Sequence, residues 1–465
     1  MSQTLDINPQ FQQALTALLD SDKHVFITGC AGTGKSTLLQ YFLSQLDYLD
    51  TVVVAPTGVA ALNVGGETIH HFLRLGPAAT RDEAISYARR AKKTKNFTLY
   101  QHLDVLVIDE ISMVRADLFD VMDVFLRTVR SRPEPFGGVR LICFGDLYQL
   151  PPVVKSDEAT IFSDYYQTPF FFSSDAFGRL QREQPDNFEY IQLHKIYRQH
   201  DPAFIDLLDH VRYQQLTDSD LELINSRVLA GSDYDELGDD YLTLTTTKVK
   251  AQAINLEHLR RLPGKLYRFQ AASSGRFHRS NQPADDILQL KVGARVMLLN
   301  NDSSGRWVNG SVGEVVDINP SDKTVSVHLD EQATTITVGP YTWESFQSVY
   351  DIRSGKIDKV SIGQFRQLPL QLAWAVTIHK AQGKTFPKII IDLGNWAFAG
   401  GQAYVAFSRG TCLDGIYLTR PLTSRDVHYD TQMTDFVDDF FVTAQRRFLF
   451  QQTHRHADGQ QETIF

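Results

Sequence analysis

A glycine-rich segment near the N-terminus, residues 29–36 with the sequence GCAGTGKS, constrains the fold of this chain more than any other feature. It fits the pattern of a phosphate-binding loop, in which glycines let backbone N–H groups turn toward phosphate oxygens. An apolar run at 24–28 precedes it, and the leucines and phenylalanine of 38–46 mark one face of a helix. The segment therefore predicts a strand–loop–helix phosphate site, with Lys35 on the β- and γ-phosphates and Ser36 on Mg²⁺.

Three more continuous apolar runs follow in the first third of the chain, at 52–55, 105–108 and 141–144. Such runs are typical of parallel strands that helices cover on both faces. A second unit of the same texture begins near Tyr190 and resumes at 388–393, after a β-rich interruption over about 266–365. We therefore predict an α/β protein with two parallel sheets. The first unit would carry a small basic helical insertion at about 76–101, and the second a small β-barrel insertion.

The charge balance and the cysteines exclude several classes of protein. The 465 residues carry 46 Lys and Arg against 55 Asp and Glu, a net charge of −9. This argues against coating nucleic acid by bulk charge but leaves a local basic groove open.

Cys30, Cys143 and Cys412 are too far apart for a disulfide framework or a zinc site, so we expect a reducing compartment. No apolar run reaches the roughly 20 residues that cross a bilayer. No secretory signal is visible, so we expect a cytoplasmic protein without a membrane partner.

Carboxylates and a glutamine stand at the ends of the strands beside the phosphate loop. Asp109 and Glu110 follow the run 105–108, where Asp109 can hold Mg²⁺ through water and Glu110 can orient or deprotonate an attacking water. Gln149 follows the run 141–144 and could sense a γ-phosphate. Without the phosphate loop upstream, each of these residues would be interpreted as part of a solvated loop or turn.

Two arginines of the second unit, Arg198 and Arg409, are candidates for the opposite side of the site. An arginine supplied by a facing domain stabilises charge on a transferring phosphoryl group and is worth roughly 10³–10⁵ in rate in other phosphate-loop enzymes. Taken alone, each is more typical of a surface or salt-bridge arginine. The assignment therefore depends on the second unit facing the first.

Eight motifs resemble, in order and spacing, those of one enzyme family. They are 29–36, 55–63 (APTGVAALN), 68–70 (TIH), 109–113 (DEISM), 145–152 (GDLYQLPP), 197–199 (YRQ), 377–383 (TIHKAQG) and 403–409 (AYVAFSR). Over about residues 10–420 the chain resembles superfamily-one helicases of the Pif1 (petite integration frequency) type, relatives of RecD. The stretch from Arg115 to Gly138 also resembles the signature that separates this family from plain RecD relatives. Without the family, that stretch would be interpreted as an amphipathic helix.

The resemblance implies two RecA-like domains, 1–189 and 190–430, with ATP in the cleft between them and a C-terminal helix and polar tail at 431–465. The β insertion would be a barrel of the Src-homology-three type, whose Asn-Gly-x-x-Gly turn matches Trp307, Asn309, Gly310 and Gly313. Members move 5′→3′ along single-stranded DNA and unwind duplexes, forks and often quadruplexes or RNA–DNA hybrids. We expect ATP and Mg²⁺ as cofactors, single-stranded DNA and DNA junctions as partners, and a monomer that can dimerise on DNA.

The resemblance also implies roles residue by residue. The ATPase residues would be Lys35, Ser36, Asp109, Glu110, Gln149, Arg198 and Arg409, of which Ser36 and Asp109 hold the metal. The nucleotide would further contact Gln12, Gly32, Thr33, Gly34, Thr37 and Gly383. The DNA strand would contact Thr57, Gly58, Asn63, His70, Thr377, His379 and Lys380, with Phe72 as a candidate for base stacking.

Several assignments stay open at this point. Gln10, Gln12 and Gln13 compete as the glutamine that reads adenine, and the spacing favours Gln12. Phe72 is equally a core residue, and the basic run 89–95 is either a contact for an incoming duplex or a solvated helix face. Arg140 stands where an uncharged polar residue is expected, without an evident reason. The functional alternatives are a RecD-like recombination or repair subunit and a phosphate-loop ATPase that remodels protein without acting on DNA.

Overall fold

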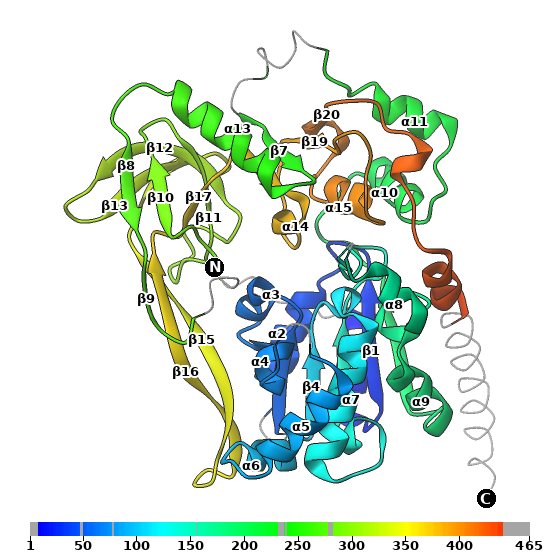
Figure 1. The fold of residues 1–465 in the computed structure, drawn as a ribbon. Helices are drawn as coiled ribbons and strands as arrows, with labels where there is room; N and C mark the ends of the chain where they lie inside the picture. Colours follow the sequence, from blue (N-terminus) through cyan, green and yellow to red (C-terminus); the bar gives the residue numbers. More distant parts are fainter. Residues whose placement is uncertain are drawn as a thin grey trace, which may run out of the picture.

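The computed structural model describes residues 8–46, 50–76, 79–155, 157–230, 237, 240–277 and 282–439. Two parallel sheets form two lobes, and a group of antiparallel strands projects from the second lobe along the side of the first (Figure 1). No helix in these described ranges is long and apolar enough to span a membrane. The expected polar tail lies outside the described residues, apart from a helical stretch at 431–439.

The first lobe is built on a six-stranded parallel sheet in the order β3-β2-β4-β5-β1-β6. Its strands are β1 (His24–Gly29), β2 (Thr51–Ala55), β3 (Glu67–Thr68), β4 (Val105–Ile108), β5 (Arg140–Phe144) and β6 (Phe188–Leu193). Its helices are α1 (Pro9–Asp20), α2 (Lys35–Ser44), α3 (Gly58–Asn63), α4 (Ile69–Leu73), α5 (Arg81–Ala91), α6 (Phe97–His102), α7 (Ala116–Arg130), α8 (Ala159–Tyr165) and α9 (Asp175–Glu183).

Both faces of this sheet are buried, as the continuous apolar strands predict. Successive strand residues point to opposite faces. Val25 and Ile27 therefore join a core with α1 and α2, whereas Phe26 joins the core that contains α7. Helix α7 contributes Phe119 and Phe125 to that second core. The stretch that resembles the family signature is thus a core helix of the first lobe.

Two features of this lobe differ from the sequence interpretation. Strand β6 pairs in parallel with β1 over its whole length, so the boundary at 189/190 divides a strand, and Tyr190 belongs to the first sheet rather than to a second unit. Arg140, for which the sequence offered no reason, also has a structural role. Its guanidinium donates to the carbonyl oxygens of Ala17, Leu18 and Lys23 at 2.7–2.8 Å, so it satisfies carbonyls at the C-terminal end of α1.

The second lobe contains a four-stranded parallel sheet in the order β18-β7-β19-β20. Its strands are β7 (Leu242–Thr245), β18 (Ala375–Thr377), β19 (Ile389–Asp392) and β20 (Ile416–Leu418). Its helices are α10 (Pro202–Arg212), α11 (Asp218–Asn225), α13 (Lys248–Arg261), α14 (Ile378–Ala381) and α15 (Gln402–Phe407). The neighbouring strands β7 and β18 are separated in sequence by the whole β-rich insertion.

The insertion forms three antiparallel sheets, β14-β13-β12-β11-β17, β10-β8 and β15-β16-β9. Its strands are β8 (Tyr267–Gln270), β9 (Ala272–Gly275), β10 (Ile287–Leu290), β11 (Arg295–Leu298), β12 (Val312–Asn319), β13 (Thr324–Leu329), β14 (Thr334–Val338), β15 (Tyr341–Asp351), β16 (Lys356–Gln367) and β17 (Leu370–Leu372). The expected β texture is confirmed, and its assignment to the Src-homology-three type stays a prediction.

The long β15–β16 hairpin reaches down the side of the first lobe as far as α6 (Figure 1). The ring of Tyr350 stacks on His102 with centroids 4.1 Å apart. The backbone N–H of Ser348 donates to the buried carboxylate of Glu67 at 3.0 Å, and that of Ile357 donates to Asp50 at 2.8 Å. The hairpin therefore ties the insertion of the second lobe to the first lobe.

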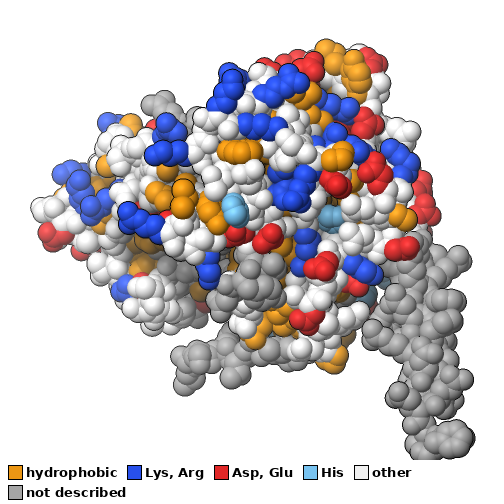
Figure 2. Space-filling view, turned by 90° about the horizontal axis from the view of Figure 1, so that it is seen from below, with side chains coloured by type: hydrophobic (Ala, Val, Ile, Leu, Met, Phe, Trp, Pro, Cys, Tyr) orange, Lys and Arg blue, Asp and Glu red, His pale blue; other side chains and the backbone are white. Residues whose placement is uncertain are grey.

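The expected basic helical insertion corresponds to α5 and α6. Helix α5 starts with a capping box between Thr80 and Glu83 and ends with Arg89 and Arg90 exposed. Acidic groups at the start of a helix and basic groups at its end both interact favourably with the helix dipole. The charge pattern of α5 therefore has a structural explanation that does not require DNA. Seen from below, the molecule presents Lys and Arg side chains interspersed with Asp and Glu (Figure 2). A role for the basic run at a DNA fork stays a prediction.

Candidate nucleotide site between the lobes

The phosphate loop connects β1 to α2, as its sequence predicts, and its glycines have conformations that other residues adopt with difficulty. Gly32 and Gly34 have φ of 85° and 84°, in the left-handed region. A Cβ atom on Gly32 would lie 2.7 Å from Cβ of Arg198. The loop is therefore in close contact with the segment that carries Arg198, and a side chain at Gly32 would separate them.

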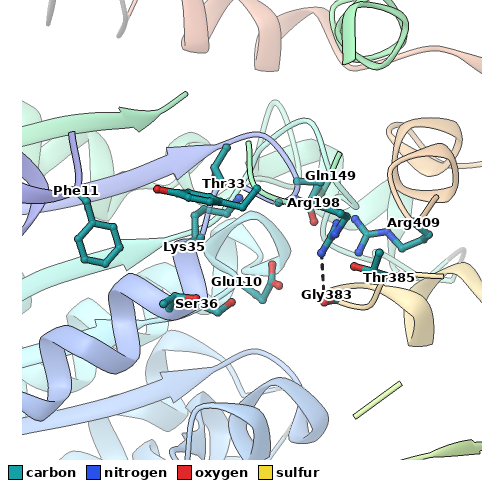
Figure 3. A pocket seen from close by; sticks show the side chains of 15 residues that line it. Phe11, Thr33, Lys35, Ser36, Glu110, Gln149, Arg198, Gly383, Thr385 and Arg409 are labelled. Carbon is teal, nitrogen blue, oxygen red and sulfur yellow. Dashed lines mark hydrogen bonds between the residues drawn. The ribbon is translucent and has the colours of Figure 1, made fainter. Parts of the chain in front are cut away.

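A cavity of about 790 Å³ opens beside this loop, between the two lobes. Its lining is Phe11, Ala31, Gly32, Thr33, Gly34, Lys35, Ser36, Thr37, Glu110, Gln149, Tyr197, Arg198, Gly383, Thr385 and Arg409. Figure 3 shows Lys35, Ser36 and Glu110 on one side, and Arg198, Arg409 and Thr385 on the other. The structure thus brings together in one cavity side chains that the sequence separates by more than 370 positions.

Three cations around this cavity are held by neutral oxygens rather than by carboxylates. Lys35 Nζ donates to the carbonyl oxygens of Gly29 at 2.7 Å and Cys30 at 3.1 Å. Arg198 donates to the carbonyl oxygen of Ser408 at 3.1 Å, and Arg409 Nη2 donates to the hydroxyl of Ser408 at 2.8 Å. In the described part of the chain, no carboxylate lies within salt-bridge distance of any of these three cations.

Burial makes these charges costly in the absence of an anion. Burial, together with the smaller effect of the nearby charge of Arg198, lowers the pKa of Arg409 to about 9. Burial also lowers the pKa of Lys35, although Asp146 and Glu110 act in the opposite direction. An anion with several negative charges would neutralise all three cations at once, and a triphosphate has the size and charge to do so.

The two carboxylates after β4 complete the site. Burial raises the pKa of Asp109 to about 6 and that of Glu110 to about 7, and the negative charge of Asp109 adds to the shift of Glu110. Glu110 has a φ of 52°, a left-handed conformation that is uncommon for this residue and is found at functional sites. The Glu110 carboxylate accepts a hydrogen bond of 3.2 Å from Nε2 of Gln382, a residue of the second lobe.

Ser36 and Asp109 suit Mg²⁺, which prefers oxygen ligands, keeps several waters and shares phosphate oxygens with the nucleotide. Ser36 lines the cavity, and Asp109 lies half-buried at the end of β4, which β5 separates from the strand of the phosphate loop. Among the described residues there is no cluster of three or more His, Cys, Asp or Glu that could hold a metal without the nucleotide. The oxygen donors therefore fit a metal bound together with phosphates.

The nucleotide residues predicted from the sequence line the cavity, with the exception of Gln12, the expected adenine reader. Gln12 is exposed on α1 and does not line the cavity, whereas its neighbour Phe11 does. Gln10 uses its side-chain oxygen to accept from the backbone N–H of His194 at 3.1 Å. Phe11 is not predicted from the sequence, because an amide side chain is the group expected to contact adenine.

The expected DNA residues fall into two groups on the two lobes. Thr57 caps α3, which carries Gly58 and Asn63, and His70 lies on α4. On the second lobe, Thr377 caps α14, which carries His379 and Lys380. Asn63 and Lys380 are exposed, and the others are half-buried. Each group follows strands at one edge of its sheet.

Phe72 does not belong to this surface. Its side chain is fully buried and packs edge-to-face on Tyr100 with centroids 5.4 Å apart. The stacking assignment for Phe72 is therefore wrong, because a base cannot reach its ring without opening the core.

The fold and the cavity define a two-lobed phosphate-loop protein with RecA-like sheets, in which both lobes contribute charged side chains to one nucleotide-sized cavity. The model of the PIF1-like helicase family matches residues 8–216. The human ATP-dependent DNA helicase PIF1 is 36% identical over 432 residues, which cover 88% of this chain and 60% of the human protein. The Bdellovibrio bacteriovorus helicase Pif1 is 31% identical, with 94% of this chain and 92% of that protein covered.

Crystal structures of Pif1 from a Bacteroides species share the whole architecture. The complex with ADP-AlF4 has a TM-score of 0.83 at 35% identity, covering 95% of this chain and 98% of that one. The unliganded form has a TM-score of 0.81, with 94% and 97% covered, and the form bound to single-stranded DNA has 0.63, with 95% and 98% covered. This chain belongs to the Pif1-like helicase family. It spans about 60% of the length of its vertebrate relatives.

Proposed function

We propose that this chain is an ATP-dependent DNA helicase that moves 5′→3′ along single-stranded DNA and unwinds duplexes, forks, and structures such as quadruplexes and RNA–DNA hybrids. The observation that carries the proposal is the convergence of Lys35, Arg198 and Arg409 on one cavity between the lobes without carboxylate partners. A nucleotide bound there contacts both lobes at once, which a protein with a single nucleotide domain does not achieve.

The chemistry follows from the positions of these groups. Lys35 and the loop N–H groups bind the β- and γ-phosphates, and Ser36 and Asp109 would hold Mg²⁺, which would neutralise phosphate charge. Glu110 accepts the proton of the attacking water, and Gln149 contacts the γ-phosphate. Arg198 and Arg409 stabilise the negative charge on the transferring phosphoryl group.

Movement follows from the loss of a bridge. The γ-phosphate joins Lys35 on one lobe to Arg409 on the other, and its release lets the lobes separate. Because Thr57 and Asn63 grip the strand from one lobe and Thr377 and Lys380 from the other, alternate gripping converts opening and closing into steps. Duplex stacking averages about 1.4 kcal/mol per base-pair step, which is modest work for one ATP.

The active unit on a single strand is a monomer, and a second copy can join at a fork. In a related structure that is 34% identical to this chain, two coordinating Pif1 helicases unwind DNA at a forked duplex. Contacts made by threonine, asparagine and backbone groups reach phosphates rather than base edges, so binding tolerates any sequence.

The test is ATP turnover with and without single-stranded DNA, run beside unwinding of duplexes that carry a 5′ or a 3′ tail. We expect DNA to stimulate turnover and only the 5′-tailed duplex to be unwound. Equal unwinding of both substrates contradicts the polarity, and turnover that ignores DNA favours a remodelling ATPase. Lys35→Ala serves as the control, since it removes the phosphate contact while leaving the DNA residues in place.

A further inference from the structure

The side-chain amide of Gln382 connects the two lobes beside the cavity, where it contacts two of the lining residues. Its Nε2 donates to Oε2 of Glu110 at 3.2 Å and to Oε1 of Gln149 at 3.1 Å. Glu110 and Gln149 belong to the first lobe, whereas Gln382 follows α14 in the second. Both hydrogens of one amide group are therefore used to hold the two residues that the hydrolysis step requires.

These contacts occupy polar atoms of both residues that the hydrolysis step would use. Gln149 donates its own amide to Asp146 Oδ2 at 3.2 Å, so its nitrogen and its oxygen are both bound to protein groups. A glutamine that contacts a γ-phosphate needs a free amide, and a general base needs its carboxylate oxygens available to water. The Gln382 amide competes with the water for Glu110.

The same short segment also carries residues assigned above to the DNA strand. The hydroxyl of Thr377 accepts from the backbone N–H of Lys380 at 3.2 Å, and the N–H of Gln382 donates to the carbonyl oxygen of His379 at 3.2 Å. These bonds join Thr377, His379, Lys380 and Gln382 into one compact turn. A displacement of α14 by a strand would therefore move Gln382 with it.

We propose that Gln382 is a positioning residue that acts as a latch between the lobes. In the absence of DNA its amide holds Glu110 and Gln149 away from the nucleotide, and a strand bound on α14 withdraws the amide and frees both. This proposal rests on the proposed function, because it assumes that α14 contacts the strand. The chain matches the unliganded Bacteroides relative more closely than the DNA-bound form, with TM-scores of 0.81 and 0.63.

The test compares Gln382→Glu and Gln382→Leu with the full-length wild-type chain. Glutamate keeps the shape of glutamine but cannot donate, and it repels Glu110. Gln364→Leu is the matched control, because Gln364 makes the same type of bond to Glu344, at 2.9 Å, on the exposed β15–β16 hairpin. The measurements are kcat and KM for ATP without DNA, the factor by which DNA stimulates turnover, and the affinity of the nucleotide-free protein for fluorescent oligothymidine.

A hydrogen bond to a charged group is worth about tenfold or more in an equilibrium constant, so both Gln382 variants should raise DNA-free kcat by about tenfold and reduce the stimulation factor accordingly. Because a strand no longer has to displace the latched state before it binds, single-stranded DNA should also bind these variants more tightly, by up to about the same factor of ten. Local damage to the fold would weaken DNA binding instead. Gln364→Leu should match the wild type in every measurement.

Unchanged DNA-free kcat together with unchanged or weaker DNA binding in Gln382→Glu would overturn the latch. This outcome is distinct from failure of the proposed function, which would show in the wild-type chain as ATP turnover indifferent to DNA. A gain in kcat with tighter DNA binding in both variants supports the latch.

Discussion

Arg212 donates from Nη2 to Oδ1 of Asp146 over 2.8 Å, and both side chains are buried. The other terminal nitrogen of Arg212 donates to the thiol of Cys30 in the phosphate loop at 2.7 Å. The rings of Tyr148 and Tyr213 flank the guanidinium at about 5 Å. The ion pair therefore joins the end of α10 to the phosphate loop and to the segment that carries Gln149.

Replacing Arg212 with methionine should destabilise the chain strongly. The change leaves Asp146 as a buried and uncompensated carboxylate, which typically costs about 3–5 kcal/mol. The control is Arg179→Met, which breaks the more exposed ion pair with Glu183 and should cost less than about 1 kcal/mol. Urea unfolding measures both, and equal small losses would show that Asp146 is solvated rather than dependent on Arg212.

His24 should make the chain less stable in mild acid. Its Nδ1 accepts from the N–H of Leu141 at 2.9 Å and its Nε2 lies 3.0 Å from Oε1 of Gln184, so the ring is neutral with its proton on Nε2. Burial lowers its pKa from 6.5 to about 4, and the charge of Arg140 contributes. His24 therefore becomes protonated below about pH 6.5 in the unfolded chain but only below about pH 4 in the folded chain.

The contribution of neutral His24 to the free energy of unfolding is fully present above pH 6.5 and is lost as the pH falls toward 4. At pH 5 this single group should account for about 2 kcal/mol of lost stability. His24→Asn keeps an acceptor for Leu141 but does not titrate. Urea unfolding at pH 7.5 and pH 5 should therefore show a smaller loss in the variant, and identical losses would mean that His24 is protonated in the folded chain.

Phe11 and Gln12 should differ in their effect on nucleotide binding. Phe11 lines the cavity and Gln12 does not. Phe11→Leu should therefore raise the KM for ATP by about 10-fold, which is the cost of a lost apolar contact. Gln12→Ala should leave KM within about twofold of the wild type. The opposite ranking, measured by steady-state kinetics, would restore Gln12 as the adenine reader.

The phosphate loop and the strand-end carboxylates could be predicted from sequence because each depends on local spacing that only a few arrangements satisfy. The positions of Arg198 and Arg409 beside Lys35 needed the family resemblance, because their proximity arises from packing between lobes. Residues whose role is set by a distant partner could not be predicted. Arg140 satisfies carbonyls of α1 more than a hundred residues away, and Gln382 of the second lobe donates to Glu110 of the first.

Local sequence also misled in two places for physical reasons. Phe72 follows a motif assigned to DNA contact, but helix periodicity turns its ring into the core against Tyr100. Tyr190 begins a run that looks like the start of a new unit, but β6 completes the first sheet at the edge of β1. In both cases the local sequence pattern was compatible with either position, and contacts with residues distant in the sequence determined which one the residue adopts.

The most direct test of the shared site is ATP turnover by Arg409→Ala and Arg409→Lys at saturating single-stranded DNA. We predict a loss of about 10³-fold in kcat for the alanine variant and a substantial loss for lysine, which lacks the forked guanidinium. Two controls show that the variants are folded. The midpoint of thermal unfolding should match that of the wild type, and the dissociation constant for oligothymidine should stay within about twofold. Turnover within about tenfold of the wild type in Arg409→Ala would contradict the claim that the second lobe acts on the nucleotide held by the first.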